Sequence, residues 1–254
     1  MMSLPRIIPC LLLQNDGLVK TTNFKNPKYI GDPINAIHIF NEKEIDELII
    51  LDISASKEGR SPNYDLLEEC AGECFMPLCY GGGIKNIQQA QKIFAIGIEK
   101  ICIQTAALHD KNFIYQLTQE FGSQSVVICL DFKRDWLGRF RIYESAISKF
   151  NGKPWESHIS DLLGAGIGEL VINSVDRDGT MAGADLELIK MVSNLELPIP
   201  IIGMGGVGSL IDIADVIRAG ASAVAGGAFF TFYGKHRAVL ITYPSREDIE
   251  EIFR

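Results

Sequence analysis

The segments PLCYGGGI at 77–84 and PIIGMGGV at 200–207 decide the fold. Each is a short apolar run that ends in glycines, and their first residues are 123 positions apart (200 − 77). Two further pairs keep the same order at nearly the same spacing: GIEKICIQTAA at 97–107 with GASAVAGGAFF at 220–230, and IIPCLLL at 7–13 with VVICLDF at 126–132. Three such pairs predict a chain made of two similar halves.

Around these segments, short apolar runs alternate with stretches of helical spacing. The runs are continuous, which is typical of parallel strands buried on both faces. We expect strands near 6–13, 47–53, 76–80, 100–104, 125–131, 169–174, 199–203 and 222–227. We expect helices near 36–45, 86–95, 111–120, 158–165, 184–194 and 209–219, with Asn86 and Ser209 as N-caps. The pattern predicts one (β/α)8 TIM barrel over residues 1–254, built from two half-barrel repeats, with a doubly wound sheet as the alternative.

Composition excludes several classes of function. The net charge is 24 − 32 = −8, so no basic face is expected for nucleic acid or for anionic lipid. No apolar run reaches the ~18 residues of a membrane span, and the N-terminal stretch lacks a signal-peptide cleavage site. The six cysteines, several of them in apolar segments, indicate a reducing cytoplasm. The four histidines, which we expect at the surface, are not spaced as metal ligands, and neither a metal nor a cofactor is expected: His38, His109, His158 and His236.

Glycines follow the predicted strands in both halves. In a barrel the loops after the strands form the functional face, and glycine lets backbone N–H groups approach an anion closely. We therefore expect one phosphate site in each half, although the glycines would also serve plain tight turns. The candidate residues are Gly82, Gly83, Gln104 and Thr105 in the first half, and Asp178, Gly179, Gly205, Gly206, Gly226 and Gly227 in the second.

A carboxylate ends only one of two equivalent strands. Asp131 closes VVICLD and is a candidate general acid or base, whereas Leu12 holds the equivalent place in IIPCLLL. Asp52 and Asp176 also stand at strand ends, where catalysis and hydrogen bonding to loop N–H groups are both open interpretations. The polar segment 133–157 predicts a long loop over the barrel mouth.

These residues resemble the cyclase (synthase) subunit of imidazole glycerol phosphate synthase, essentially from end to end. The matching motifs are RIIPCL at 6–11, GDP at 31–33, DEL at 46–48, LDISAS at 51–56, GGGI at 81–84, EKICIQTAA at 99–107, FGSQSVV at 121–127, LDFKR at 130–134, GAGIGEL at 164–170, SVDRDGT at 174–180 and GMGG at 203–206. The resemblance implies a half-barrel duplication. It also implies a class I glutaminase docked at the N-terminal face, which would release ammonia into the barrel core.

The resemblance further implies an ammonia gate of two basic and two acidic residues at the barrel base. The gate positions fall on Arg6, Glu47, Lys100 and Glu169. Each begins a predicted buried strand, where a lone charge would be costly, so a neutralised ring is physically sensible. A purely structural network that closes the barrel is the alternative interpretation.

The family's two catalytic aspartates fall on Leu12 and Asp131, and its active-site lysine falls on Lys20. The first aspartate is therefore missing. Other departures are Gln104 for the usual asparagine, Met204 and Gly227 for serines, and the segment 133–157, which fails to match.

Three functions follow from this pattern. The favoured hypothesis is an ammonia-conducting partner of a glutaminase that serves the amidation of a surface-polysaccharide sugar, as in a divergent branch of the family that lacks the same aspartate. A genuine cyclase, a lyase of histidine biosynthesis, remains the alternative, with Asp16 as a possible substitute acid. A non-catalytic scaffold that activates the glutaminase is the third. The ligand is expected to be a phosphorylated or sugar small molecule.

Overall fold

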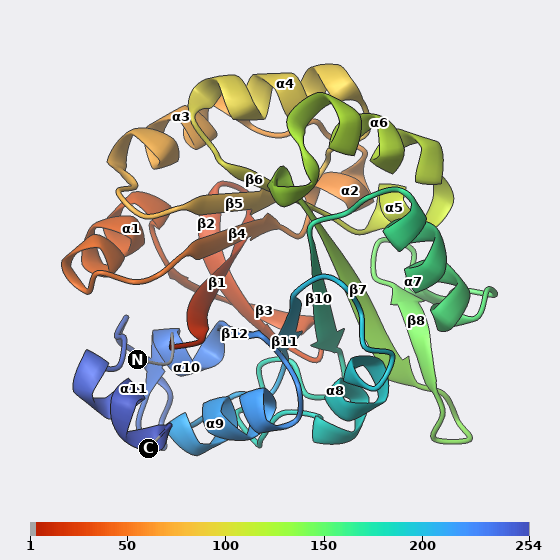
Figure 1. The fold of residues 1–254 in the computed structure, drawn as a ribbon. Helices are drawn as coiled ribbons and strands as arrows, with labels where there is room; N and C mark the ends of the chain where they lie inside the picture. The colour runs from red at the N-terminus through yellow and green to blue at the C-terminus, as the bar shows by residue number, and fades with distance from the viewer. Residues whose placement is uncertain (1–3, 254) are drawn as a thin grey trace.

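A computed structural model describes residues 4–253. Parallel strands close into a barrel in the order β10, β11, β12, β1, β4, β5, β6 and β7, and the ring closes where β7 pairs with β10 (Figure 1). The predicted (β/α)8 barrel is confirmed. The strands are β1 (Arg6–Gln14), β4 (Leu48–Asp52), β5 (Leu78–Gly81), β6 (Lys100–Ile103), β7 (Val126–Arg134), β10 (Glu169–Ser174), β11 (Ile201–Met204) and β12 (Ala223–Gly226).

Helices surround the barrel and cover the outer faces of its strands (Figure 1). The longer ones are α1 (Pro33–Glu42), α3 (Tyr64–Glu73), α4 (Ile87–Ile96), α6 (Lys111–Phe121), α7 (Trp155–Gly164), α8 (Leu186–Ser193), α9 (Leu210–Arg218) and α11 (Arg246–Ile252). Shorter ones are α2 (Ala55–Glu58), α5 (Thr105–His109), η1 (Ser123–Ser125) and α10 (Ala228–Thr231). None of the helices in the described residues is both long and apolar enough to pass through a bilayer.

The N-caps of α4 and α9 show the internal repeat at atomic detail. Asn86 and Ser209 lie 123 positions apart, and both have φ −153° and ψ 165°. Each side chain accepts a hydrogen bond from the backbone N–H three residues later, which satisfies one of the free donors of the first helical turn. The predicted caps are therefore confirmed, and they occupy equivalent places in the two halves.

Strand extensions follow β1 and β7, the equivalent strands of the two halves. After β1 come β2 (Gly17–Thr22) and β3 (Lys25–Gly31), and after β7 come β8 (Phe140–Glu144) and β9 (Lys149–Phe150), all antiparallel. The prediction of a long loop over 133–157 was wrong. β7 instead continues to Arg134 and turns back into β8, because Asp135 accepts hydrogen bonds from the turn N–H groups of Leu137 and Arg139. A further short hairpin, β13 (Phe232–Tyr233) with β14 (Ala238–Val239), lies near the C-terminal end.

Buried apolar side chains form two separate clusters. The larger cluster lies between the barrel and its helices. The smaller one fills the barrel interior and consists of Ile8, Cys10, Leu12, Val19, Ile49, Cys79, Cys102, Val127, Cys129, Val171, Ile202, Ala223 and Ala225. The interior is thus lined by uncharged side chains, including four thiols, between the two ends where polar groups gather.

Candidate functional site

A cavity lies at the C-terminal ends of the barrel strands, where a (β/α)8 protein carries its functional groups. Every predicted phosphate-site residue lines it, together with Leu12, Lys20 and Asp131. The structure therefore brings the candidates from both halves to one place. These lining residues are Gly82, Gly83, Gln104, Thr105, Asp178, Gly179, Gly205, Gly206, Gly226 and Gly227.

The glycine loops of the two halves approach their neighbouring strands in the same way. Gly82 has φ +126°, and a Cβ there would lie 2.5 Å from the carbonyl oxygen of Asp52. Gly205, its equivalent, has φ +98°, and a Cβ there would lie 2.7 Å from the carbonyl oxygen of Ser174. Only glycine fits both the backbone conformation and the contact. The glycines at these positions are thus required by the turns, whether or not an anion binds there.

Asp131 lies near the end of β7 and is 5% exposed. Its Oδ2 accepts a hydrogen bond from Gln104 Nε2 at 2.5 Å, and its Oδ1 accepts one from Asn173 Nδ2 at 2.9 Å. Burial raises the pKa of Asp131 from its ordinary 3.8 to about 7, and the negative charge of Asp178 raises it further. Hydrogen bonds from Asn173, Gln104 and Ser145 favour the charged form and oppose this rise. A carboxyl group with this pKa can both give and take a proton near neutral pH.

Leu12 stands in the cavity wall, as the half-barrel comparison predicts. It is 8% exposed and packs with the interior cluster, to which Leu51 and Met204 add further apolar surface. Asp16 does not replace it. Asp16 lies outside the cavity lining in the described part of the chain, and its carboxylate accepts a hydrogen bond from Asn63 at 3.0 Å.

The ammonium group of Lys20 pairs with Asp178. Lys20 comes from β2, is 6% exposed, and its Nζ lies 3.4 Å from Asp178 Oδ1; Thr21 Oγ1 donates to Asp178 Oδ2 at 3.4 Å. Gly227 fits this arrangement, because a Cβ there would lie 2.9 Å from Lys20 Nζ and 2.8 Å from the carbonyl oxygen of Cys10. The serine that the resemblance leads one to expect at this position would therefore displace the lysine.

Asp52 and Asp176 serve the local backbone. Asp52 Oδ1 accepts hydrogen bonds from the N–H groups of Ser54 and Ala55, both at 2.9 Å, although its side chain also lines the cavity. Asp176 Oδ2 accepts from the N–H of Arg134 at 2.8 Å. These contacts favour the structural interpretation of both aspartates over a catalytic one.

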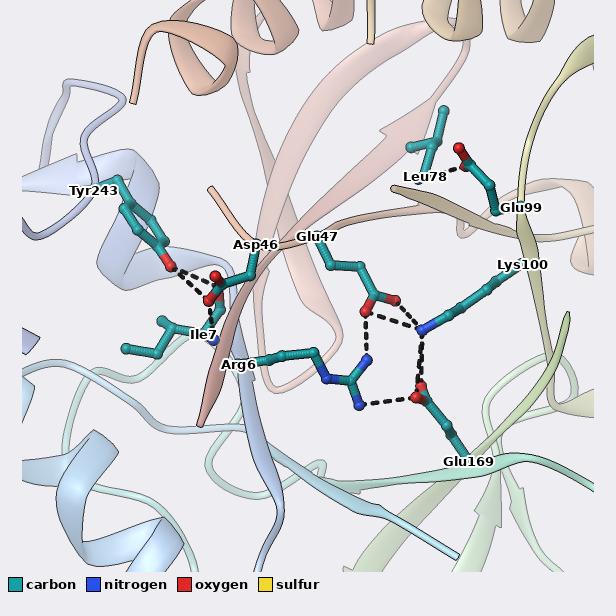
Figure 2. Close-up of polar contacts among 9 residues, drawn as sticks. All are labelled: Arg6, Ile7, Asp46, Glu47, Leu78, Glu99, Lys100, Glu169 and Tyr243. Atoms are coloured by element: carbon teal, nitrogen blue, oxygen red, sulfur yellow. Dashed lines mark hydrogen bonds and ion pairs between the residues drawn. The ribbon is translucent and has the colours of Figure 1, made fainter. Parts of the chain in front are cut away.

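The four predicted gate residues form a closed ring at the opposite, N-terminal end of the barrel (Figure 2). We call Arg6, Glu47, Lys100 and Glu169 the charge ring. Arg6 lies 2.5 Å from Glu47 and 2.8 Å from Glu169, while Lys100 lies 3.0 Å from Glu47 and 3.3 Å from Glu169. Each basic group thus contacts both acids. Since Glu47 is 2% exposed and Glu169 is 8% exposed, the ring neutralises charges that would be costly alone.

Two thiols of the interior cluster, those of Cys10 and Cys102, remain protonated. Burial raises the pKa of the Cys10 thiol well above its ordinary range. Hydrogen bonds with the Cys129 and Cys79 thiols do the same for the pKa of Cys102. A neutral small molecule would therefore meet no charged side chain among the interior cluster residues.

Two groups at the site were not found by sequence reasoning. Asn173, next to the last residue of β10, donates to Asp131, and Ser145, in the turn after β8, donates to Gln104 Oε1 at 2.9 Å. The polar ending of an apolar run was the one available signal for Asn173.

His158 is 3% exposed rather than on the surface, because it lies on the inner face of α7, where it contacts Asn151 Oδ1 at 3.0 Å. No cluster of His, Cys, Asp or Glu within residues 4–253 is suited to hold a metal ion.

Fold and site together define a duplicated (β/α)8 barrel with one cavity shared by its two halves and a charge ring at its base. The family described as Histidine biosynthesis protein matches residues 6–236, which is most of the sequence. The chain belongs to this family.

Individual relatives match over nearly their full length. A protein of Pseudomonas aeruginosa with the provisional name imidazole glycerol phosphate synthase subunit hisF2 is 51% identical over 243 residues, covering 94% of this chain and 95% of the relative. A protein of Leptospira borgpetersenii with a similarly provisional HisF name is 49% identical over 253 residues, covering 98% of each. Imidazole glycerol phosphate synthase subunit HisF of Dictyoglomus thermophilum is 36% identical over 227 residues, covering 89% of this chain and 90% of the relative.

Proposed function

We propose that this barrel receives ammonia from a class I glutaminase and conducts it to the cavity for amidation of a surface-polysaccharide sugar, rather than for cyclisation of a histidine precursor. One observation carries the proposal. The charge ring is complete, yet the cavity wall holds Leu12 where the cyclase family has its first catalytic aspartate. An aliphatic side chain can neither give nor take a proton.

The interior of the barrel supports passage of ammonia. In this proposal the charge ring is the gate on the glutaminase side, and separation of one of its ion pairs would admit a neutral molecule. Beyond it the interior cluster is uncharged and ends at Asp131. Ammonia would stay in its neutral form along such a path, because an apolar surrounding disfavours ammonium. The proposal places the protein in the cytoplasm, which the six free cysteines support.

The cavity would hold a phosphorylated or sugar ligand. The glycine loops of the two halves offer backbone N–H groups at two places, and Lys20 offers a cation beside the second. The contact between Lys20 Nζ and Asp178 Oδ1 is long for an ion pair, at 3.4 Å. The Lys20 ammonium group would therefore shift from Asp178 toward a bound anion.

A genuine cyclase is the second candidate, and the retained cavity favours it. In this function Asp131 acts as acid and base, and the glycine loops of both halves hold the two phosphates of the substrate. Cyclisation would still need a second group that transfers protons. Asp178, which contacts Lys20 and lines the cavity, is the carboxylate available for this role besides Asp131.

An isotope competition experiment tests the proposed ammonia path. The glutaminase, the barrel, the separate synthetase and the acceptor sugar are incubated with glutamine labelled in its amide nitrogen and an excess of unlabelled ammonium. We expect the label in the amidated sugar, and we expect Lys100→Ala to reduce that labelling while the barrel still folds. Incorporation of unlabelled nitrogen alone by the unaltered protein would contradict the proposal.

A further inference from the structure

The side-chain amide of Gln104, at the cavity, is held in one orientation by residues outside the ring of barrel strands. Gln104 follows β6 at the N-cap position of α5, but its side chain makes no capping hydrogen bond there. It turns instead to Asp131, to which its Nε2 donates. An amide can present either its NH₂ or its carbonyl oxygen to a carboxyl group, and the two presentations favour opposite protonation states.

Two groups of the segment after β7 select the NH₂ presentation. The hydroxyl of Ser145 donates to Gln104 Oε1 at 2.9 Å. The backbone carbonyl of Tyr143, which can only accept, lies 3.4 Å from Gln104 Nε2. The Tyr143 carbonyl requires the NH₂ group of Gln104 on the side facing it and Asp131, and the Ser145 hydroxyl, which could also accept, donates to the carbonyl oxygen in this orientation. Because the contacts are made by a hydroxyl and a backbone carbonyl, which carry no charge, this selection does not depend on whether Asp131 is ionised.

The side-chain amide of Asn173, the other one that contacts Asp131, has no second contact that fixes its orientation. Asn173 donates to Asp131 Oδ1, but its own Oδ1 is buried without a hydrogen-bond partner among the described residues. Nothing besides Asp131 therefore fixes which way Asn173 points. Gln104 is the amide whose orientation the rest of the protein imposes.

The strand β8, which precedes Ser145, also contacts the helix α5 that follows Gln104. Glu144 Oε2 lies 2.8 Å from His109 Nε2 at the end of α5, and Glu144 Oε1 accepts from Asn151 Nδ2 at 2.7 Å. Glu144 is buried, whereas His109 is largely exposed. The contact gives the hairpin a second link to α5, besides the contact of Ser145 with Gln104.

We propose that the β8–β9 hairpin, through the Tyr143 carbonyl and the Ser145 hydroxyl, holds the Gln104 amide with its NH₂ group toward Asp131 and so controls whether Asp131 is ionised, with Ser145 as a positioning residue. This inference goes beyond the proposed function, since it concerns the carboxyl group of the cavity and holds for any acceptor. When the hairpin is in place, Asp131 stays ionised at a lower pH than burial alone would allow. When the hairpin moves away with Tyr143 and Ser145, the amide is free to turn, and its carbonyl oxygen then accepts a hydrogen bond from protonated Asp131.

The other groups around Asp131 are held in place, so the contact between the hairpin and Gln104 is the one that can change. Cys129 Sγ lies 3.9 Å from Asp131 Oδ1 on the same strand, and Cys102 belongs to the neighbouring β6. Asp178 faces Asp131 from the segment after β10 and is paired with Lys20 from β2. These groups belong to the barrel wall or to the buried pair, whereas Ser145 is on a hairpin outside the ring of strands.

The test is a pH titration of Asp131 followed by carbon-13 NMR on protein labelled at aspartate carboxyl carbons, with the resonance assigned through Asp131→Asn. We expect Ser145→Ala to raise the midpoint by roughly one pH unit, and Ser145→Thr, which keeps the hydroxyl, to leave it near the original value. We expect Gln104→Met to raise it at least as much. Adding Ser145→Ala to Gln104→Met should raise the midpoint by less than Ser145→Ala does alone, because part of the effect of Ser145 passes through Gln104 and part acts directly on Asp131.

Two results would overturn the inference. One is an unchanged midpoint in Ser145→Ala, and the other is an equally large upward shift when Ser145→Ala is added to Gln104→Met, which would mean that Ser145 acts on Asp131 only directly and not through Gln104. Gln104→Asn gives a separate reading, because its shorter side chain cannot reach Ser145 and Asp131 together; an unchanged midpoint there also counts against the lock. No acceptor or glutaminase is present in these titrations, so failure of the proposed function would not alter them.

Discussion

Replacing Asp131 with asparagine should remove a pH-dependent cost to stability. Burial raises the pKa of Asp131 in the folded protein to about 7, whereas the unfolded chain ionises near 3.8. Relative to the unfolded chain, the folded protein is most stable where Asp131 is protonated in both states, which is below pH 4. This stability is lost as the pH rises toward 7, because the unfolded chain gives up the Asp131 proton at a lower pH than the folded protein does. At 1.36 kcal/mol per pH unit, the interval from 3.8 to about 7 corresponds to about 4 kcal/mol.

The assay is urea unfolding of the unaltered protein and of Asp131→Asn at a series of pH values from 4 to 8. The asparagine places an NH₂ group opposite Gln104 Nε2 or Asn173 Nδ2, which adds a constant cost from an unfavourable contact. The informative quantity is therefore the change with pH in the difference between the two free energies of unfolding. We expect this difference to move by about 4 kcal/mol in favour of asparagine between pH 4 and 7, and to level off above pH 7.

Leu12→Met is the matched control, since it exchanges one uncharged side chain of the cavity wall for another. Its effect on the free energy of unfolding should be the same at every pH. If Asp131→Asn gives an equally flat difference, the carboxyl group titrates alike in the folded and unfolded chain. The account of Asp131 as a buried proton-transferring group would then be wrong.

Further predictions concern the charge ring, the glycine loops and the missing aspartate. Lys100→Met should lower the free energy of unfolding by about 2–3 kcal/mol in urea titrations, because it leaves excess negative charge, and adding Glu169→Gln should recover part of that loss; a double variant less stable than the single one would contradict this. Gly205→Ala should cost about 1–3 kcal/mol and abolish binding of inorganic phosphate measured by calorimetry, whereas Gly152→Ala, which meets open space, should change neither. Leu12→Asp should lower stability by about 2–4 kcal/mol in the same titrations, more at pH 8 than at pH 4, because a buried carboxyl group has a raised pKa; an equal loss at both pH values would speak against burial.

The barrel itself was predictable because its signals are local. Continuous apolar runs marked the strands, and paired glycines with φ +126° at Gly82 and +98° at Gly205 marked equivalent turns. The spacing of 123 positions between these runs reappears as identical backbone angles at Asn86 and Ser209. The face on which the site would lie followed from the fold class, because loops after parallel strands meet at one end.

The finer site depends on contacts between distant residues that no spacing reveals. Lys20 and Asp178 are 158 positions apart, and their pairing arises only when β2 folds back over the barrel mouth. The contact of Ser145 with Gln104 needs the antiparallel return of β8, which the polar composition of 133–157 concealed. Single charges and amides carry no periodicity, so their partners appear only once the chain is folded.

The most direct test of the central claim is turnover of the cyclase substrate, the two-phosphate ribulosyl-formimino precursor, with an ammonium salt as nitrogen source. The account predicts no imidazole glycerol phosphate, or a rate about two to four orders of magnitude below that of an ordinary cyclase, because Leu12 cannot transfer a proton. Turnover at the rate of an ordinary cyclase would contradict it, and would show that the barrel does the chemistry of histidine biosynthesis without its first aspartate.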